Sequence, residues 1–354
     1  MKNLEVKKTF ESKNTSMPKG RIPAWDIIKL LTIFGVIWGH CIQGFLTSEP
    51  SASFIYRFLY SYHMPLFMTI SGYFSVSSMT LNSLIFIKKK FLQLIYPCII
   101  WGIILWIILE CSNSFHYGIH EFSISNILTD LYWLSNFWYL KSCFICYILA
   151  YIGMHSNSRK NIWIPTTLLI SQAMSPFMVS FLYPCFIIGL ELRQDESFFR
   201  KVLSYKYIIT ILFLTMLCLW NQELWNKSHG FSIEIFTLDT QDWVIILLCR
   251  LYRLLLGIVG SLSMISILYN IFNVSKTNFL TENCSKWGKH TLKIYILQSV
   301  VLEKGISQYI NLDHTDIIIF HLFIVPIFSL LTLITCIAII RLIERVPLLN
   351  RLLW

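Results

Sequence analysis

The chain has 354 residues, of which 55% are hydrophobic and only 14% are charged. Soluble domains usually carry about 25% charged residues, so this composition excludes an ordinary soluble protein and indicates an integral membrane protein. The formal net charge of +10 comes from basic residues that concentrate in alternate loops, which accounts for it without a nucleic-acid partner.

The first 20 residues are polar and rich in lysine, without the apolar stretch and small-residue cleavage site of a signal peptide. We therefore expect no removable signal peptide, and we expect residues 1–20 to form a disordered basic cytoplasmic tail. No internal repeat and no soluble domain follows. Residues 21–354 are predicted to form one membrane-embedded domain.

Apolar segments long enough to span a bilayer recur along the rest of the chain. A spanning helix needs about 20 mainly apolar residues, and we place ten, at approximately 26–46, 54–76, 91–109, 137–154, 161–176, 179–191, 206–222, 243–270, 291–309 and 317–340. The fifth and sixth are short and contain prolines, so one re-entrant pair is an alternative there. The predicted fold is an all-α integral membrane protein with about ten transmembrane helices.

Charge in the loops predicts the orientation of these helices. Alternate loops hold most of the lysines and arginines, and Lys227 is the only basic residue in the segments between them, around 47–53, 110–136, 223–242 and 310–316. The positive-inside rule then places both termini in the cytoplasm. The longer outer segments are rich in acidic and aromatic residues. These suit a surface that faces sugar hydroxyls, although interfacial anchoring explains the aromatic residues equally well.

The first two apolar segments carry ionisable groups where a bilayer makes charge costly, namely Asp26, Lys29, His40, Arg57 and His63. Lys29 and His40 are eleven positions apart, about three helical turns, so they share a face of the first segment. Asp26 precedes Lys29 by one turn, which allows an ion pair where the helix enters the membrane. These residues are therefore candidates for a functional site.

The depth of the two histidines favours a polar cavity. If the hydrocarbon begins near residue 27, His40 lies about 20 Å into a core roughly 30 Å thick, and His63 lies about 14 Å below the opposite face. Gly35 and Gly39 form a G-x-x-x-G motif that allows close approach of a second helix. Pro65 frees a backbone carbonyl beside His63. Together these features predict a polar cavity in the outer half of the bilayer.

Each candidate also has a packing interpretation. A membrane histidine can be a hydrogen-bonded packing residue, and a lysine near a helix end can extend to the lipid headgroups. His40 favours function because an ordinary spanning helix avoids histidine at that depth. For His63, Lys29 and Asp26, function and packing both remain open.

Further charges lie inside later apolar segments. Arg250 and Arg253 share one side of the eighth segment and need an anion, either a carboxylate elsewhere or a phosphate or thioester oxygen of a ligand. We expect Lys141 to extend to the interface, and Glu303 and Lys304 to form a solvated pair at the outer end of the ninth segment.

The ten cysteines lie mostly within or beside apolar runs, where cysteine behaves as a small hydrophobic residue. They give no disulfide framework. Cys143 and Cys146 form a C-x-x-C motif, but no second Cys/His pair accompanies it at the spacing of a zinc site, so we expect packing and no metal.

Several motifs resemble a known family. They are Asp26-x-x-Lys29, then ten residues ending in Gly39, then His40; His63-Met64-Pro65-Leu66-Phe67; Ser71-Gly72-Tyr73; Phe137-Trp138-Tyr139-Leu140; and Trp287 to Tyr295. This pattern is similar to the membrane acyltransferase family 3, in its subgroup of fucose O-acetylase-like and polysaccharide O-acetyltransferases. The resemblance extends over nearly the whole chain after residue 20.

The resemblance implies a ten-helix enzyme of the cell membrane, multi-pass and of the bacterial inner membrane, that transfers an acyl group from acyl-CoA. The group is usually acetyl from acetyl-CoA, which is a substrate and not a bound cofactor, and the acceptor is a sugar hydroxyl of a surface polysaccharide or lipid-linked glycan. His40 corresponds to the family's essential histidine, and Lys29 stands where many members have arginine. Gln298 stands where many members have histidine, and glutamine cannot shuttle a proton at neutral pH.

On this basis we expect His40 to act as general base on the acceptor hydroxyl, because imidazole titrates near working pH. His63 or Ser71 would orient His40 or stabilise the oxyanion, and Arg250 and Arg253 would neutralise charge on the donor. The remaining candidates for donor or substrate binding are Trp138 and Tyr295. An acyl-histidine intermediate is an alternative.

Acyl-CoA is cytosolic whereas both histidines are predicted outward of the midplane. Either the pantetheine arm extends inward past Lys29 and Asp26, or the helices are shifted from the predicted placement.

A transporter or flippase of a lipid-linked glycan is the alternative from another class of protein. It would use the same arginines and histidines for substrate phosphates and would need no acyl donor. No symmetric pair of broken helices favours it. A purely structural membrane subunit is disfavoured by the buried ionisable residues. Labelled acetyl-CoA separates these hypotheses, because only an acyltransferase transfers the label to glycan.

Overall fold

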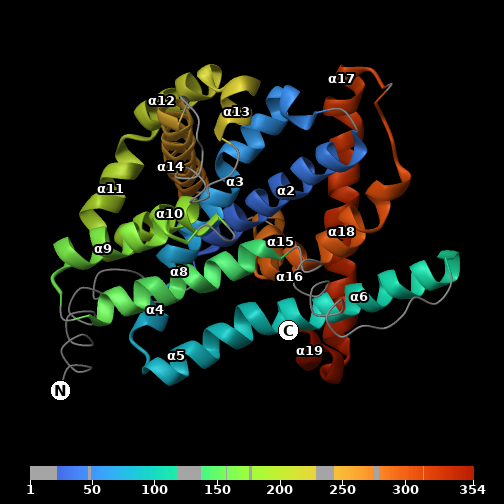
Figure 1. Cartoon of the computed structure of the whole chain (residues 1–354), viewed down its shortest axis with the longest axis horizontal. Helices are drawn as coiled ribbons and strands as arrows, with labels where there is room; N and C mark the ends of the chain where they lie inside the picture. Colours follow the sequence, from blue (N-terminus) through green and yellow to red (C-terminus); the bar gives the residue numbers. More distant parts are fainter. Residues whose placement is uncertain are drawn as a thin grey trace.

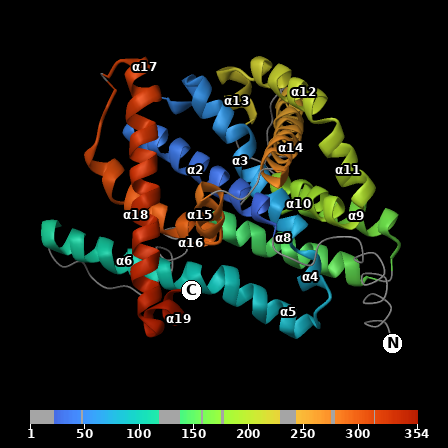
Figure 2. The same cartoon turned by 180° about the vertical axis from the view of Figure 1, so that it is seen from behind.

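The computed structural model describes residues 22–46, 49–117, 137–156, 158–174, 178–228, 243–274, 279–313 and 315–354. Within these ranges every regular element is a helix (Figures 1 and 2), which confirms the all-α prediction for the described residues. The predicted tail over 1–20 lies outside the described residues, as do 118–136 and 229–242 of the expected outer segments.

Each of the ten predicted segments overlaps a helix. The corresponding elements are α2 (Pro23–Phe45), α3 (Phe54–Tyr73), α6 (Tyr96–Tyr117), α8 (Trp138–His155), α9 (Lys160–Gln172), α10 (Val179–Gln194), α12 (Lys206–Leu219), α14 (Trp243–Val274), α16 (Thr291–Gln298) and α18 (Val325–Arg345). Shorter elements join them, namely η1 (Pro50–Ala52), α4 (Val76–Met79), α5 (Ser83–Lys90), η2 (Phe91–Ile95), α11 (Glu196–Ser204), α13 (Gln222–Ser228), α15 (Phe279–Gly288), η5 (Ser299–Glu303), η6 (Ile306–Tyr309), α17 (Ile317–Ile319), η7 (Phe320–Ile324) and α19 (Pro347–Leu353).

Four helices of the described part are long and apolar enough to cross a bilayer, at Pro23–Phe45, Ser83–Ile108, Trp243–Asn273 and Ile317–Arg345. A fifth results if α11 and α12, bent by 69° at their junction, are one span. Helices α9 and α10 have 13 and 16 residues, fewer than the roughly 20 that a full span needs. The ten transmembrane helices and the cytoplasmic location of both termini therefore remain predictions.

The α2–α3 pair lies at the centre of the molecule, in blue in Figure 1. Helix α3 packs against α2, α10 and α14, while α2 also contacts α14, α15 and α18. Close approach of backbones makes this arrangement possible. A Cβ atom added at Gly189 of α10 would lie 1.8 Å from the carbonyl oxygen of Thr69 in α3. The two helices therefore approach each other so closely that only glycine fits at this position.

The close approach predicted at the G-x-x-x-G motif is made by α3, and it depends on one of the two glycines. A Cβ atom at Gly39 would lie 2.7 Å from Cε2 of Tyr60, whereas one at Gly35 would meet Leu59 at an ordinary 3.5 Å. Gly39 directly precedes His40, so this close approach brings the ring of Tyr60 beside the histidine.

Candidate active site

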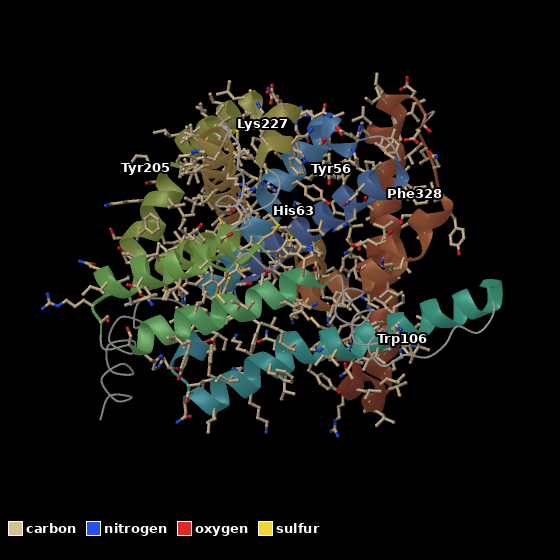
Figure 3. All side chains as sticks on the ribbon, viewed as in Figure 1. Tyr56, His63, Trp106, Tyr205, Lys227 and Phe328 are labelled. Carbon is tan, nitrogen blue, oxygen red and sulfur yellow. The ribbon has the colours of Figure 1, made fainter. Side chains whose placement is uncertain are left out.

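A cavity of about 640 Å³ opens between the C-terminal end of α2 and the N-terminal half of α3. We call it the histidine cavity, and its walls include His40, His63, Trp138, Arg253, Tyr295 and Glu303. In Figure 3, Tyr56 and His63 lie in the interior of the molecule, whereas Lys227 and Tyr205 lie near its edge. The structure thus brings both predicted histidines to one cavity.

His40 faces a carboxylate. Its Nδ1 lies 3.1 Å from Oε1 of Glu303, and the Glu303 side chain is only 19% exposed. Gln298 donates from Nε2 to the same Oε1 at 3.1 Å, and the hydroxyl of Ser299 donates to Oε2 at 2.9 Å. These two hydrogen bonds fix the orientation of the carboxylate that pairs with His40.

The expectation that Glu303 forms a solvated pair with Lys304 is therefore wrong, because its mostly buried carboxylate pairs with His40. The physical reason is the π-helical turn η5, in which the amide of Lys304 bonds to the carbonyl of Ser299 five residues earlier. This wider turn places Glu303 on the same side as Gln298 and Ser299. Glu303 is the only acidic residue of the predicted 291–309 segment, and that signal could have identified it.

His63 is almost fully buried, and its Nδ1 lies 2.5 Å from the carbonyl oxygen of Leu59. A carbonyl only accepts, so Nδ1 carries the hydrogen and Nε2 of the neutral ring is left as an acceptor. The ring of Tyr60 packs edge-on against His63 at 4.6 Å and against His40 at 6.4 Å. Its hydroxyl donates to Gln43 at 2.9 Å. Tyr60 therefore fixes the spacing of the two histidines.

The two arginines of α14 differ in position. Arg253 lines the histidine cavity, donates to the carbonyl of Ser228 at 3.3 Å and faces the rings of Trp225 and Phe181. Arg250 is also buried but is not among the residues that line this cavity. Arg57 donates to three backbone carbonyls, those of Ser51, Ala52 and Trp220, and so holds the start of α3 in place.

A second cavity of about 260 Å³ lies at the opposite end of the α2–α3 pair. We call it the lysine cavity, and its walls include Lys29, Ser71, Gln93, Tyr139, Lys289 and Tyr295. Lys29 forms the predicted ion pair with Asp26 at 3.5 Å and lies 4.3 Å from the centre of the Phe74 ring. The hydroxyl of Ser285 also donates to Asp26, at 3.5 Å, so Asp26 anchors Lys29 at the entrance of α2.

Hydroxyl groups gather along the lysine cavity. The hydroxyls of Ser71 and Tyr139 lie 3.3 Å apart, and Tyr147 donates to the carbonyl of Ser71 at 3.1 Å. The ring of Tyr139 lies 5.7 Å from that of Tyr295. Tyr295 belongs to the walls of both cavities. Ser71 consequently lies with Lys29 and not with His40.

Lys90 differs in burial from the two lysines that precede it. Lys88 and Lys89 are exposed, but Lys90 is only 4% exposed and lies 3.6 Å from the centre of the Tyr147 ring. Its Nζ is 3.5 Å from Oε1 of Gln93, which lines the lysine cavity. Lys90 lies on the buried face of the continuous α5–η2–α6 helix, between the buried side chains of Phe86 and Leu94.

Cys143 and Cys146 are both buried in α8. Within the part of the chain that the structure describes, no group of three or more His, Cys, Asp or Glu side chains could hold a metal ion.

Outside the predicted spans, the hydrogen bond from Lys227 lowers the pKa of Glu223 on α13.

Comparisons with known proteins identify the family of this chain. A family profile described as an acyltransferase domain matches residues 22–341. Nodulation protein NolL of Mesorhizobium japonicum is 24% identical over 293 residues, which cover 78% of this chain and 76% of that protein. NolL of Sinorhizobium fredii is 22% identical over 289 residues, which cover 78% and 77%. No solved structure matches. Because the profile spans most of the chain, this protein belongs to the acyltransferase 3 family and is an acyltransferase.

Proposed function

We propose that this protein is a membrane O-acyltransferase that moves an acetyl group from acetyl-CoA to a hydroxyl of a cell-surface polysaccharide or lipid-linked glycan. The observation that carries the proposal is the His40–Glu303 pair, 3.1 Å between Nδ1 and Oε1, on the wall of a 640 Å³ cavity. Ligand cavities of about 300 to 1,000 Å³ hold small molecules, so one or two sugar units fit such a space.

His40 is the general base of the proposed reaction. The Glu303 carboxylate favours the tautomer with hydrogen on Nδ1, which leaves Nε2 free to accept a proton. The acceptor hydroxyl gives its proton to Nε2, and its oxygen forms a bond to the thioester carbonyl carbon. The carbon–sulfur bond then breaks, and the imidazolium returns the proton to the departing thiolate. The products are an O-acyl ester and the free thiol of coenzyme A.

The acyl donor enters through the lysine cavity. Lys29 and Lys289 line this cavity and attract donor phosphates, whereas its volume of about 260 Å³ suits a narrow thioester arm. The hydroxyls of Ser71, Tyr139 and Tyr295 are the polar groups along that path, and they suit hydrogen bonding to a thioester carbonyl. This proposed route is the first of the two alternatives given for the cytosolic donor, in which the pantetheine arm extends inward past Lys29 and Asp26.

The proposed setting is a multi-pass protein of the bacterial inner membrane, with membrane lipids around the bundle. The four long apolar helices support a membrane location. The glycan acceptor would approach from the side opposite Lys29, where the histidine cavity opens between the ends of α2 and α3.

The test compares glycan O-acetyl content, measured by NMR of surface polysaccharide, in cells that lack the protein, carry it, or carry a variant at equal membrane abundance. We expect His40→Ala to remove the acetyl signals that depend on the protein. His155→Ala is the matched control, since His155 bonds to the Tyr151 carbonyl and lines neither cavity. Unchanged acetylation combined with less glycan at the surface would instead indicate a transporter.

A further inference from the structure

Arg253 is a buried cation in the wall of the histidine cavity. It is 7% exposed, and its hydrogen bond to the Ser228 carbonyl uses one of its five N–H groups. The rings of Trp225 and Phe181 lie 5.1 and 5.3 Å from its guanidinium carbon. Aromatic faces attract the cation but supply no strong hydrogen-bond acceptor, so the Ser228 carbonyl is the acceptor that the described residues offer to Arg253.

No carboxylate of the described ranges forms an ion pair with Arg253. Glu303 shares the cavity but is committed to His40, Gln298 and Ser299. On α13, which carries Trp225, Glu223 pairs with Lys227 at 2.7 Å. A buried arginine needs an anion to offset its desolvation, and none of these carboxylates supplies it.

Lys304 adds a second cation to the same cavity. Apart from three tyrosines, the ionisable lining among the described residues is then Arg253, Lys304 and Glu303 together with His40 and His63. Apart from the histidines, this lining has two positive charges, on Arg253 and Lys304, and one negative charge, on Glu303. The cavity therefore favours an anionic ligand beside the general base.

From this arrangement we propose that the acceptor carries a negatively charged group, a carboxylate or a phosphate, which the guanidinium of Arg253 binds in bidentate fashion while the acceptor hydroxyl lies at His40. This inference rests on the proposed function and names its acceptor class. It also assigns Arg253 to the acceptor, because Arg253 lies in the cavity of His40 and not in that of Lys29. Arginine suits this task because its planar fork matches both anions.

The experiment measures transfer of labelled acetyl from acetyl-CoA by membranes that contain the full-length protein. One pair of acceptors is de-O-acetylated surface polysaccharide of the source cells and the same polysaccharide with its carboxylates chemically reduced to alcohols. The other pair is lipid-linked oligosaccharide and the same oligosaccharide after mild acid has removed the lipid phosphate. The first pair tests a sugar carboxylate, and the second tests a carrier phosphate.

We expect Arg253→Gln to raise KM for the anionic acceptor about tenfold or more and to leave KM for acetyl-CoA unchanged. Arg253→Lys, which keeps the charge but loses the fork, should give an intermediate KM. In one of the two pairs, the acceptor without its charge should react equally with the unaltered protein and with Arg253→Gln. Arg200→Gln is the matched control, since Arg200 is exposed and pairs with Glu196.

An unchanged KM for every acceptor in Arg253→Gln, or a raised KM for acetyl-CoA, would overturn the inference. So would a difference that persists in both uncharged acceptors. Membrane abundance and monodispersity in detergent identify a variant that fails to fold, in which case Arg253→Lys decides. Failure of the proposed function gives a separate result, because the unaltered protein would then transfer no label to any acceptor.

Discussion

The histidine cavity and the lysine cavity lie at opposite ends of the same two helices, yet they differ in size and in chemistry. The former encloses about 640 Å³ and holds a His–Glu pair with a buried arginine, whereas the latter encloses about 260 Å³ and holds hydroxyl groups behind Lys29. Lys29 and His40 share a face of α2, three turns apart, so one helix serves both cavities. In the proposed reaction, proton transfer takes place in the histidine cavity and the donor enters through the lysine cavity.

His40→Ala should give the largest effect and should act on the histidine cavity alone. We expect kcat to fall about 10²- to 10⁴-fold, the range for loss of a general base, with KM for acetyl-CoA nearly unchanged. Initial rates with labelled acetyl-CoA at equal membrane abundance measure both constants. A raised KM for acetyl-CoA at unaltered kcat would show that His40 belongs to donor binding.

Glu303→Gln should have the next largest effect. Glutamine keeps the size of the side chain but can donate to Nδ1 of His40, which favours the wrong tautomer, so kcat should fall about 10- to 10³-fold. The pH dependence of kcat should change as well. Glu344→Gln is the matched control, because Glu344 lies 3.5 Å from Nδ1 of His290 outside both cavities. Equal rates in the two variants would remove Glu303 from the mechanism.

Lys29→Gln tests the other cavity. If Lys29 binds donor phosphates, KM for acetyl-CoA should rise about tenfold while KM for the acceptor and kcat stay nearly constant. Lys88→Gln, an exposed lysine at the same end of the molecule, should leave KM unchanged. A fall in kcat without a change in KM would mean that the division between the two cavities is wrong.

Tyr295→Phe should give the smallest effect, and it acts where the cavities meet. Loss of one hydroxyl removes a hydrogen bond worth about 0.5–1.5 kcal/mol, so kcat should fall roughly 2- to 13-fold. The aromatic ring remains, so the thermal stability of the detergent-solubilised protein should be unchanged. An altered KM for only one substrate would assign Tyr295 to a single cavity.

Much of this arrangement could be predicted from the sequence, because it depends on local pattern. The apolar runs identify the helices, and the eleven-residue interval between Lys29 and His40 places them on one face. Ser71 was expected beside His40, yet it lies in the lysine cavity. The eight-residue interval between His63 and Ser71, about 12 Å along a helix, is the sequence signal that could have separated them.

The features that the sequence did not reveal depend on packing between distant segments. Glu303 meets His40 only because the π-turn η5 departs from the regular helical period. Lys90 is buried because α8 supplies the ring of Tyr147 above it. The contact of α10 with α3 at Gly189 also needs the folded structure, since neither helix alone shows which face will be approached.

The position of Tyr295 in the walls of two distinct cavities has a consequence for the cell. In the proposed reaction the nucleotide part of the donor stays at the Lys29 end and the acceptor at the other end, so only the narrow thioester arm with its acyl group reaches this ring. The coenzyme is released where metabolism can reload it, and no bulky carrier has to be exported. The bilayer can therefore keep its ion gradients during every cycle.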